Sequence, residues 1–580
     1  MKGRLIATAA CLVAGLLVPA AASPAGAQVT RCDQLSDDQS RVNAPRRYGF
    51  LPDRVVSLGS DVDGAAIQIG VVRPRVPAGR RVPVILTASP YLHALQTVDL
   101  RKCASFLVDN FVPQGYAVAL LPVRGTGDSG GCFDLFGSRE RADIDQAVRW
   151  LGTQPWSNGS VGMIGKSYDG GTAWEGAASG NPHLKTIVPI SGVPDVFDLL
   201  FGSGTPDWRG PGILGGVYFA ENLGFIDGRA PERNLETTAC PEHAVAELAS
   251  VYSSLTGDLD PFGYWADRRY TDDILARYRG SVFWVHGLQD WNVNPGSQFP
   301  LVSDLRRRGV PVKALLGQWG HSHPDEVEPP SRRPDYADIL LRWFDRWLKG
   351  VRGPTGPAAQ VEDDAGSWRN VSAWPAPGRR ATYRLSASGE LTAKGAAAGT
   401  AVLAPDPVHV QDPAAAQGAG IGSVPALDAV RGVCEQPVCA AFRSKPFTAP
   451  YRLSGLPRVQ LSATPLGAGG TVSVFLFAEG RNGLRRVGWG QVDLRFPRGR
   501  GASQAVQPGE PLTLDFVLQP MESVLPKGER LVMMVSMGNT YNRLPSAPTG
   551  PVMLQLGTKA GGLTVTEAAP DSSQFFKPPR

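Results

Sequence analysis

The chain has 580 residues, which at about 150 residues per domain is too long for a single hydrophobic core. Hydrophobic residues make up 42% of it, enough to bury large cores, so wholesale disorder is excluded. The 68 glycines and 50 prolines favour loop-rich α/β and all-β architectures over helical bundles. The formal net charge is only +5, both signs are interspersed and no Lys/Arg block occurs, so no nucleic-acid partner is indicated.

The first residues have the three parts of an export signal. Lys2 and Arg4 precede an apolar run over residues 5–22, and Ala25-Gly26-Ala27 supplies a small-residue cleavage site. We expect a signal peptide over residues 1–27, cleaved near Ala27, and a secreted, extracellular protein. An uncleaved anchor fits less well, because the run is short and weakly hydrophobic. No later segment is long and apolar enough to predict a membrane span.

Six cysteines follow that signal, and an even number in an exported chain suggests disulfides. They are Cys32, Cys103, Cys132, Cys240, Cys434 and Cys439. The last two bracket the short loop "CEQPVC" and form the best local pair, while the remaining connectivity stays open. No Cys or His spacing is typical of a zinc site, so we expect neither a metal nor another cofactor.

Strand and helix patterns alternate in two stretches of the chain, which predicts a mostly parallel sheet covered on both faces. Buried strands are predicted where apolar runs end in loops, and helices where apolar residues recur on one face. The predicted strands cover residues 82–91, 115–125, 160–165, 281–287 and 310–320, and the predicted helices cover 141–151, 171–179, 297–309 and 335–350.

Changes of this rhythm suggest the domain boundaries. Residues 28–192 and 271–352 carry the alternating pattern, and residues 193–270 between them are rich in Gly, Pro and aromatics, as expected of an inserted cap. Short β runs without helices follow a linker, so we expect an antiparallel β-sandwich over residues 358–580.

Gly165 to Gly170, "GKSYDG", is the most informative motif for chemistry. A sharp turn between a strand and a helix requires small neighbouring residues, and it projects a serine above the carboxyl edge of the sheet. The helix that follows offers N–H groups to a developing oxyanion. A lone Gly-x-Ser is usually a plain turn. The strand before it and the helix after it favour Ser167 as a nucleophile.

An acid and a histidine follow Ser167 in the chain order that such a fold requires. Asp290 ends the strand-loop "SVFWVHGLQDW", and His321 directly follows the predicted strand "VKALLGQW". His323 lies further from the strand, and His409 falls in the β region. Taken singly, Asp290 could be a turn residue and His321 a surface loop histidine, but their joint order at strand ends favours a triad.

Four segments together resemble the signature segments of the Xaa-Pro dipeptidyl-peptidases and the related bacterial cocaine esterases. They are "GTGDSGGC", "WLGTQPWSNGSVGMIGKSYDGG", "VHGLQDWNV" and "GQWGHSHP". The nucleophile motif of that family is Gly-x-Ser-Tyr-x-Gly, which Gly165 to Gly170 matches. The resemblance covers most of the chain. It implies an α/β-hydrolase core, an inserted helical cap and a C-terminal jelly-roll β-sandwich.

The resemblance also assigns roles to particular residues. It implies that Ser167 is the nucleophile, Asp290 the acid and His321 the base. The oxyanion hole of the family pairs the N–H after the serine with a tyrosine hydroxyl from a "PY" loop, and Tyr168 and Tyr91 match those positions. A packed loop aromatic is the plainer interpretation of Tyr91.

The expected activity is that of a secreted serine hydrolase, a dipeptidyl-peptidase that cleaves Xaa-Pro dipeptides from peptide N-termini through an acyl-enzyme. Such an enzyme needs a carboxylate for the free α-ammonium of its substrate. Asp169, Asp195, Asp198 and Glu221 are candidates, and each could equally be a solvated surface acid. The alternatives are an esterase or acylase acting on small acyl esters or amides, and a carbohydrate-binding protein with a decayed hydrolase domain. The intact Ser, Asp, His order argues against decay. The oligomeric state stays open.

Overall fold

The structure is a computed structural model, and it describes residues 40–92, 94–204, 240, 242, 258–260, 263–290, 292–405, 439–499, 501–537, 549–559, 561–569 and 573–579. The expected signal peptide, most of the expected cap, Glu221 and His409 lie outside these residues.

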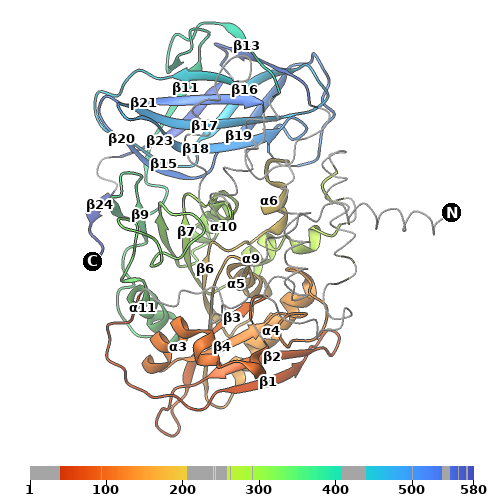
Figure 1. The fold of residues 1–580 in the computed structure, drawn as a ribbon, viewed down its shortest axis with the longest axis vertical. Coiled ribbons are helices and arrows are strands. Elements are labelled where there is room, and N and C mark those ends of the chain that lie inside the picture. Colours follow the sequence, from red (N-terminus) through yellow and green to blue (C-terminus); the bar gives the residue numbers. More distant parts are fainter. Residues whose placement is uncertain are drawn as a thin grey trace, which may run out of the picture.

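One large sheet organises the first part of the molecule (Figure 1). In the described part of the chain it has 11 strands in the order β1-β2-β4-β3-β5-β6-β7-β8-β9-β10-β24. All neighbours from β4 to β9 are parallel, and the pairs at both ends of the order are antiparallel. The strands are β1 (Arg54–Gly59), β2 (Ala66–Val72), β3 (Val82–Ser89), β4 (Ala117–Pro122), β5 (Ser157–Lys166), β6 (Leu184–Ile190), β7 (Ser281–Gly287), β8 (Val312–Gly317), β9 (Ala359–Glu362), β10 (Trp368–Val371) and β24 (Ser573–Phe576).

Helices cover both faces of this sheet, as the alternating pattern predicts. The α-helices are α2 (Leu100–Cys103), α3 (Ser105–Phe111), α4 (Ser138–Thr153), α5 (Tyr168–Ser179), α6 (Val196–Phe201), α9 (Thr271–Arg277), α10 (Pro295–Arg307) and α11 (Tyr336–Leu348). Short 3₁₀ turns are η2 (Leu95–Thr97), η3 (Val112–Gln114), η4 (Gly202–Gly204) and η7 (Ala266–Arg268). None of the helices in the described ranges has the length and apolarity to cross a bilayer.

The two cores of this part lie on opposite faces of the sheet. In β3, Val84 and Leu86 belong to the core under α4, α5, α9 and α10, whereas Ile85 belongs to the core under α3 and α11. Successive side chains of a strand point to opposite faces, so a strand buried on both sides reads as a continuous apolar run. This explains why "VPVILTAS" shows no alternation of apolar and polar residues.

The second part of the molecule is an antiparallel β-sandwich, drawn at the top of Figure 1. Within the described residues, β14, β21, β17 and β18 form one sheet, and the other strands form a sheet of 9 strands packed on it. The strands are β11 (Gly378–Leu385), β12 (Leu391–Thr392), β13 (Gly399–Leu403), β14 (Cys439–Arg443), β15 (Tyr451–Gly455), β16 (Arg458–Pro465), β17 (Thr471–Gly480), β18 (Gly483–Asp493), β19 (Leu512–Val517), β20 (Met521–Leu525), β21 (Arg530–Met537), β22 (Val552–Leu556) and β23 (Gly562–Ala568).

Three strands beyond residue 358 join the first sheet instead of the sandwich. β9 pairs in parallel with β8, β10 pairs with β9, and β24 pairs with β10. We expected residues 358–580 to belong to the sandwich, and for these three strands the structure differs. The reason is that a short strand of four residues carries no signal of the sheet that it will join. The strands of the sandwich itself run from β11 to β23.

Disulfides occur in both parts of the molecule. Cys132 is bonded to Cys240, which lies in the segment expected as the cap. Cys103 and Cys439 are disulfide-bonded as well. The expected pairing of Cys434 with Cys439 involves a residue outside the described ranges and stays a prediction.

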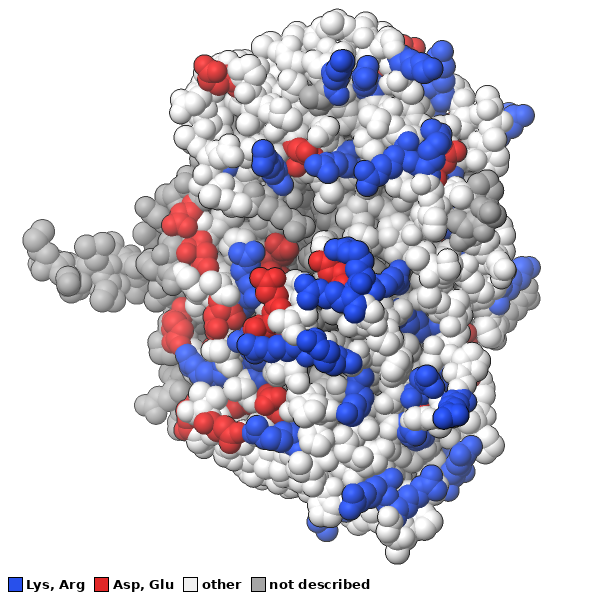
Figure 2. Space-filling model, turned by 180° about the vertical axis from the view of Figure 1, so that it is seen from behind, with Lys and Arg blue, Asp and Glu red and all other residues white. Residues whose placement is uncertain are grey.

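On the face of the molecule in Figure 2, basic and acidic side chains lie interspersed.

Candidate active site

Ser167 lies at the sharp turn between β5 and α5. Its backbone has φ 63° and ψ −120°, a left-handed conformation that a residue with a Cβ rarely adopts. Hydrogen bonds hold the turn on both sides, from the Ser167 N–H to the carbonyl of Ile190 (2.9 Å) and from the Gly171 N–H to the carbonyl of Ser167 (3.0 Å). Strain of this kind persists only where the surroundings impose it, and it is concentrated at functional sites.

Two glycines make this turn possible. A Cβ on Gly165 would stand 2.3 Å from the Cβ of Asp169, and a Cβ on Gly170 would stand 2.6 Å from the Cα of Gly192. Both contacts are far shorter than real carbon atoms allow. The Gly-x-Ser-x-x-Gly pattern is therefore a packing requirement of the turn.

Asp290 and His321 lie together in the loops that follow β7 and β8. His321 Nδ1 is 2.8 Å from Asp290 Oδ2, the distance of a charge-assisted hydrogen bond. Backbone hydrogen bonds join the two loops, from the Leu288 N–H to the carbonyl of Gly317 and from the Gln289 N–H to the carbonyl of Trp319. The pair is thus fixed by main-chain contacts as well as by its own bond.

The carboxyl of Asp290 is surrounded by donors. Oδ1 accepts the backbone N–H groups of Asn292 (3.0 Å) and Val293 (2.9 Å), and His286 Nε2 lies 3.5 Å from Oδ2. Burial by itself raises the pKa of this carboxyl. The nearby charge of His321 and the hydrogen bonds from His286 and His321 outweigh that effect and hold the pKa well below its usual range. Asp290 is therefore an anion that can orient and stabilise a protonated imidazole.

The structure separates His321 from the other histidine of its loop. His321 is hydrogen-bonded to Asp290 Oδ2, whereas the side chain of His323 is buried. No hydrogen bond joins Ser167 to His321 in the structure, and the hydrogen bond between a catalytic serine and its base often forms fully only in the complex with substrate.

Tyr91 follows β3 in a tight turn and lies beside the serine turn. Its N–H donates to Ser89 Oγ (3.1 Å), and its ring meets the ring of Tyr168 edge to face, with centroids 6.4 Å apart. Strands β3, β5, β7 and β8 run parallel, so Tyr91, Ser167, Asp290 and His321 all follow the carboxyl ends of strands in one sheet.

Tyr168 faces the core with its side chain. Its hydroxyl accepts the Phe136 N–H (3.1 Å) and donates to Glu140 Oε2 (2.9 Å). Its backbone N–H, at the first residue of α5, is therefore the group of Tyr168 that could serve an oxyanion.

Two buried acids lie beneath this turn, and sequence reasoning missed them. Glu140 of α4 and Glu175 of α5 are both fully buried. Burial raises the pKa of Glu140 to about 8, against the lowering effect of the bond from Tyr168. Burial raises the pKa of Glu175 well above its usual value too, and the charge of Glu140 adds to this. Both groups favour the neutral carboxylic acid.

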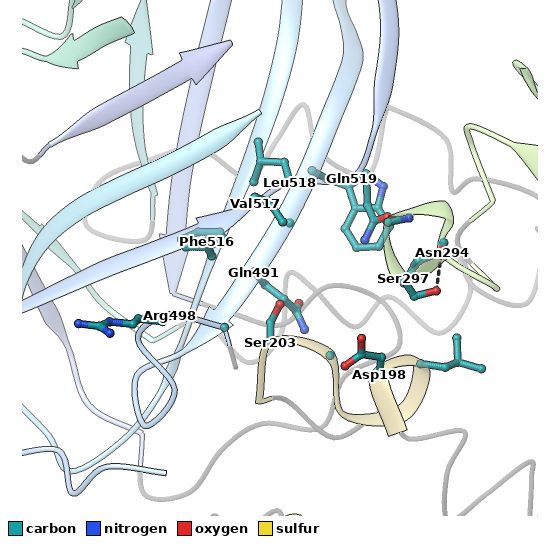
Figure 3. A pocket seen from close by; sticks show the side chains of 16 residues that line it. Asp198, Ser203, Asn294, Ser297, Gln491, Arg498, Phe516, Val517, Leu518 and Gln519 are labelled. Carbon is teal, nitrogen blue, oxygen red and sulfur yellow. Dashed lines mark hydrogen bonds between the residues drawn. The ribbon is translucent and has the colours of Figure 1, made fainter. Parts of the chain in front are cut away.

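Among the carboxylates considered for a substrate ammonium, Asp198 lines the pocket shown in Figure 3. Asp169 is buried, and Asp195 caps α6 by accepting the Asp198 N–H (3.0 Å) and pairs with Arg269 (3.5 Å). Burial, with the charge of Asp198, raises the pKa of Asp195 to about 6. Glu221 lies outside the described residues.

The pocket has about 110 Å³ of free space and lies between the first sheet's domain and the sandwich. Asp198 and Ser203 line it from α6 and η4, Asn294 and Ser297 from the start of α10, and Gln491 from β18. Asn294 is four residues beyond Asp290, so the pocket adjoins the acid loop. Within the described ranges, no group of three or more His, Cys, Asp or Glu side chains is arranged to hold a metal ion.

Two family models match successive parts of the chain. Residues 63–323 match the X-Pro dipeptidyl-peptidase (S15 family), and residues 353–574 match the X-Pro dipeptidyl-peptidase C-terminal non-catalytic domain. A protein of Streptomyces avermitilis named "Putative Xaa-Pro dipeptidyl-peptidase" is 28% identical, over 92% of this chain and 84% of its own.

Solved structures share the fold at lower identity. An alpha-amino acid ester hydrolase has a TM-score of 0.68 at 19% identity, covering 95% of this chain and 100% of its own. An aminopeptidase from a marine sediment Thaumarchaeota archaeon has a TM-score of 0.67 at 18% identity, covering 91% of this chain and 99% of its own. These likenesses agree with an α/β-hydrolase core followed by a β-sandwich.

Proposed function

We propose that this chain is a serine hydrolase of the X-Pro dipeptidyl-peptidase (S15) family, because residues 63–323 match that family and residues 353–574 match its C-terminal non-catalytic domain. From this premise we propose that it removes Xaa-Pro dipeptides from peptide N-termini, with Ser167 as nucleophile, Asp290 as acid and His321 as base. The observation that carries the assignment of residues is the Asp290–His321 hydrogen bond of 2.8 Å, at the same sheet edge as the strained Ser167.

In the proposed reaction His321 takes the proton of Ser167 as the hydroxyl oxygen attacks the carbonyl carbon of the scissile bond. The Asp290 anion holds Nδ1–H of His321, which leaves Nε2 to accept this proton, and stabilises the imidazolium that forms. The Tyr168 N–H and the Tyr91 hydroxyl donate to the tetrahedral oxyanion. His321 then protonates the leaving amine, and water, deprotonated by the same base, hydrolyses the acyl-enzyme.

We assign the substrate ammonium to Asp198. This carboxylate lines a pocket next to the acid loop, whereas Asp195 already serves a helix cap and an ion pair. A cation held by a half-buried carboxylate contributes binding energy that a neutral ester would not use. Asp198→Asn should therefore raise KM for a dipeptidyl substrate and leave KM for a simple acyl ester nearly unchanged.

The proposal includes export. The charged, apolar and small-residue segments of residues 1–27 support a signal peptide cleaved near Ala27. The disulfides support an oxidising compartment.

A substrate panel tests the function. Rates are measured on Xaa-Pro anilides, on other aminoacyl anilides and on simple acyl esters, with Ser167→Ala as the control for contaminating activity. Preference for Xaa-Pro anilides supports the dipeptidyl-peptidase. If only the esters are hydrolysed, the esterase or acylase is the correct function. If none reacts and a fluorophosphonate does not label Ser167, the assignment of the nucleophile is wrong.

A further inference from the structure

His286 is the second histidine at the acid of the proposed triad, and the mechanism above does not use it. It lies at the end of β7, four residues before Asp290, and is fully buried. Every polar contact of its ring is internal. Nδ1 accepts a hydrogen bond from the indole N–H of Trp284 (3.3 Å) and lies 3.0 Å from the amide nitrogen of Gln298. Nε2 lies 2.7 Å from the carbonyl oxygen of Val293.

These contacts determine where the imidazole carries its proton. An indole N–H can only donate, so Nδ1 must be the acceptor and carries no proton. A carbonyl oxygen can only accept, so Nε2 must carry the proton. Both ends of the ring give the same answer, a neutral imidazole with its proton on Nε2.

The donor on Nε2 acts on the acid loop. It bonds the carbonyl of Val293, whose own N–H donates to Asp290 Oδ1 (2.9 Å), and it lies 3.5 Å from Asp290 Oδ2. His286, Val293 and Asp290 therefore close a ring of contacts. This ring turns Oδ2 toward His321 and keeps the carboxyl from rotating.

We propose that His286 is a positioning residue that holds Asp290 against His321 through a fixed Nε2–H tautomer. This role rests on the proposed function, because it acts on the reaction only through the acid. It also gives Trp284 a role, since its indole N–H is the donor that excludes the other tautomer.

The test compares two amides at position 286. The side chain of Gln reaches about as far as Nε2 and can present an N–H there, whereas that of Asn reaches only as far as Nδ1. The measured quantity is the rate at which a fluorophosphonate labels Ser167, which depends on the triad but on no particular substrate. We expect His286→Asn to slow labelling about tenfold or more, and His286→Gln to stay within about threefold of the wild type.

A double-mutant cycle separates positioning from mere packing. In the Asp290→Asn background, where the acid is already lost, His286→Asn should change the labelling rate by less than about twofold. Wild-type labelling by His286→Asn overturns the inference. So do equal losses in the Asn and Gln variants, or losses that are additive with Asp290→Asn. Absence of labelling in the wild type would instead mean that the proposed function is wrong.

A measurement on the wild-type protein needs no folded variant. Long-range ¹H–¹⁵N correlation of ¹⁵N-histidine protein at neutral pH reports the tautomer of each imidazole, and the His286 signal is the one lost in His286→Gln. A neutral ring with its proton on Nε2 supports the inference. A proton on Nδ1, or on both nitrogens, overturns it.

Discussion

Local backbone chemistry places Ser167, whereas contacts between distant segments place its proposed partners. The serine takes its position from a turn with φ 63° and from nearby glycines, at which an added Cβ would collide with neighbouring atoms. Asp290 and His321 depend on hydrogen bonds between two loops. Variants at the serine should therefore change chemistry alone, and variants in the loops should change geometry as well.

Ser167→Ala should abolish turnover and leave the fold intact, because the hydroxyl is small and the turn is preformed. Removing the nucleophile of such a triad costs roughly 10⁴–10⁶ in rate. His321→Ala should be about as severe and His323→Ala mild, because His321 is hydrogen-bonded to Asp290 Oδ2. Steady-state kinetics on the best substrate of the panel measures this. More than about a tenth of the wild-type kcat in Ser167→Ala would exclude Ser167, and a severe loss in His323→Ala alone would mean that the base is the other histidine.

Tyr91→Phe keeps the ring that packs against Tyr168 and deletes only the hydroxyl. Loss of one oxyanion donor costs about 10²–10³ in kcat, so we expect a large fall in kcat with a small change in KM and in Tm. Turnover like that of the wild type would show that the hydroxyl is not in the oxyanion hole. A second backbone amide would then have to replace it.

Glu140 should make the stability depend on pH. Its pKa is about 8 in the folded protein and returns toward 4.5 on unfolding. A raised folded pKa means that its stabilising effect is fully present below about pH 4.5 and is lost as the pH rises toward about 8. As the pH is raised from about 4.5 to about 8, Tm should therefore decrease in the wild type and decrease less in Glu140→Gln. The exposed Glu328→Gln serves as the control, and parallel Tm curves for the wild type and Glu140→Gln would contradict the prediction.

Sequence alone predicted the residues that follow strands directly and missed those whose role depends on packing. Ser167, Asp290 and His321 stand at strand ends in the order of a hydrolase triad, which a linear pattern can reveal. His286 stands inside the apolar strand "SVFWVHG" and resembles a core residue. Glu140 belongs to the charged start of α4, and only the packing of α4 on α5 buries it.

At the scale of elements, the alternating stretches were predictable because each strand and helix carries its own period. The strand expected over residues 281–287 is β7, and the helix expected over 141–151 is the middle of α4 (Ser138–Thr153). The sheet that a short strand joins is not a local property. The sequences of β9, β10 and β24 would be equally compatible with either sheet, so their place in the first sheet could not be predicted.

The disulfide between Cys132 and Cys240 should stabilise the fold by closing a long loop. The two cysteines are 108 residues apart, and Arg139 Nη1 lies 3.1 Å from each sulfur. Replacing both by Ser should lower the free energy of unfolding by about 2–4 kcal/mol, with a fall in Tm by calorimetry.

Mass spectrometry with and without reduction counts the free thiols directly, and the native protein should contain no more than one pair of them. An unchanged Tm in the double Ser variant would contradict a stabilising role. Six freely alkylated cysteines would contradict the disulfides altogether.

At the scale of the molecule, Glu522 of β20 connects the sandwich to the base loop. Its carboxylate accepts from Arg452 Nε (2.6 Å), Ser454 Oγ (2.7 Å) and Trp374 Nε1 (3.0 Å). Its backbone carbonyl accepts from the side chain of Gln318 (3.1 Å), which stands three residues before His321. The sandwich thereby contacts the loop that carries the proposed base.

Glu522→Ala should destabilise the protein by about 3–5 kcal/mol, because it removes the buried acceptor of the Arg452 Nε–H and of the Trp374 indole N–H. Denaturant unfolding measures the loss. Arg458→Ala, which breaks an exposed pair with Asp515, is the matched control and should cost less than about 1 kcal/mol. Equal losses in the two variants would show that the buried contacts of Glu522 contribute no more than a surface pair.

The chain leaves the first sheet after β10 and returns to it at β24, the strand that pairs with β10. A domain attached by a single linker can swivel in any direction about that linker. Here the two connections to the sandwich start from hydrogen-bonded neighbouring strands only about 5 Å apart, so both are fixed to the same sheet. Twisting of the sandwich about these two connections would strain the hydrogen bonds between β10 and β24. We expect the motion that remains to be a rocking of the sandwich, which would widen or narrow the pocket between the two parts of the molecule.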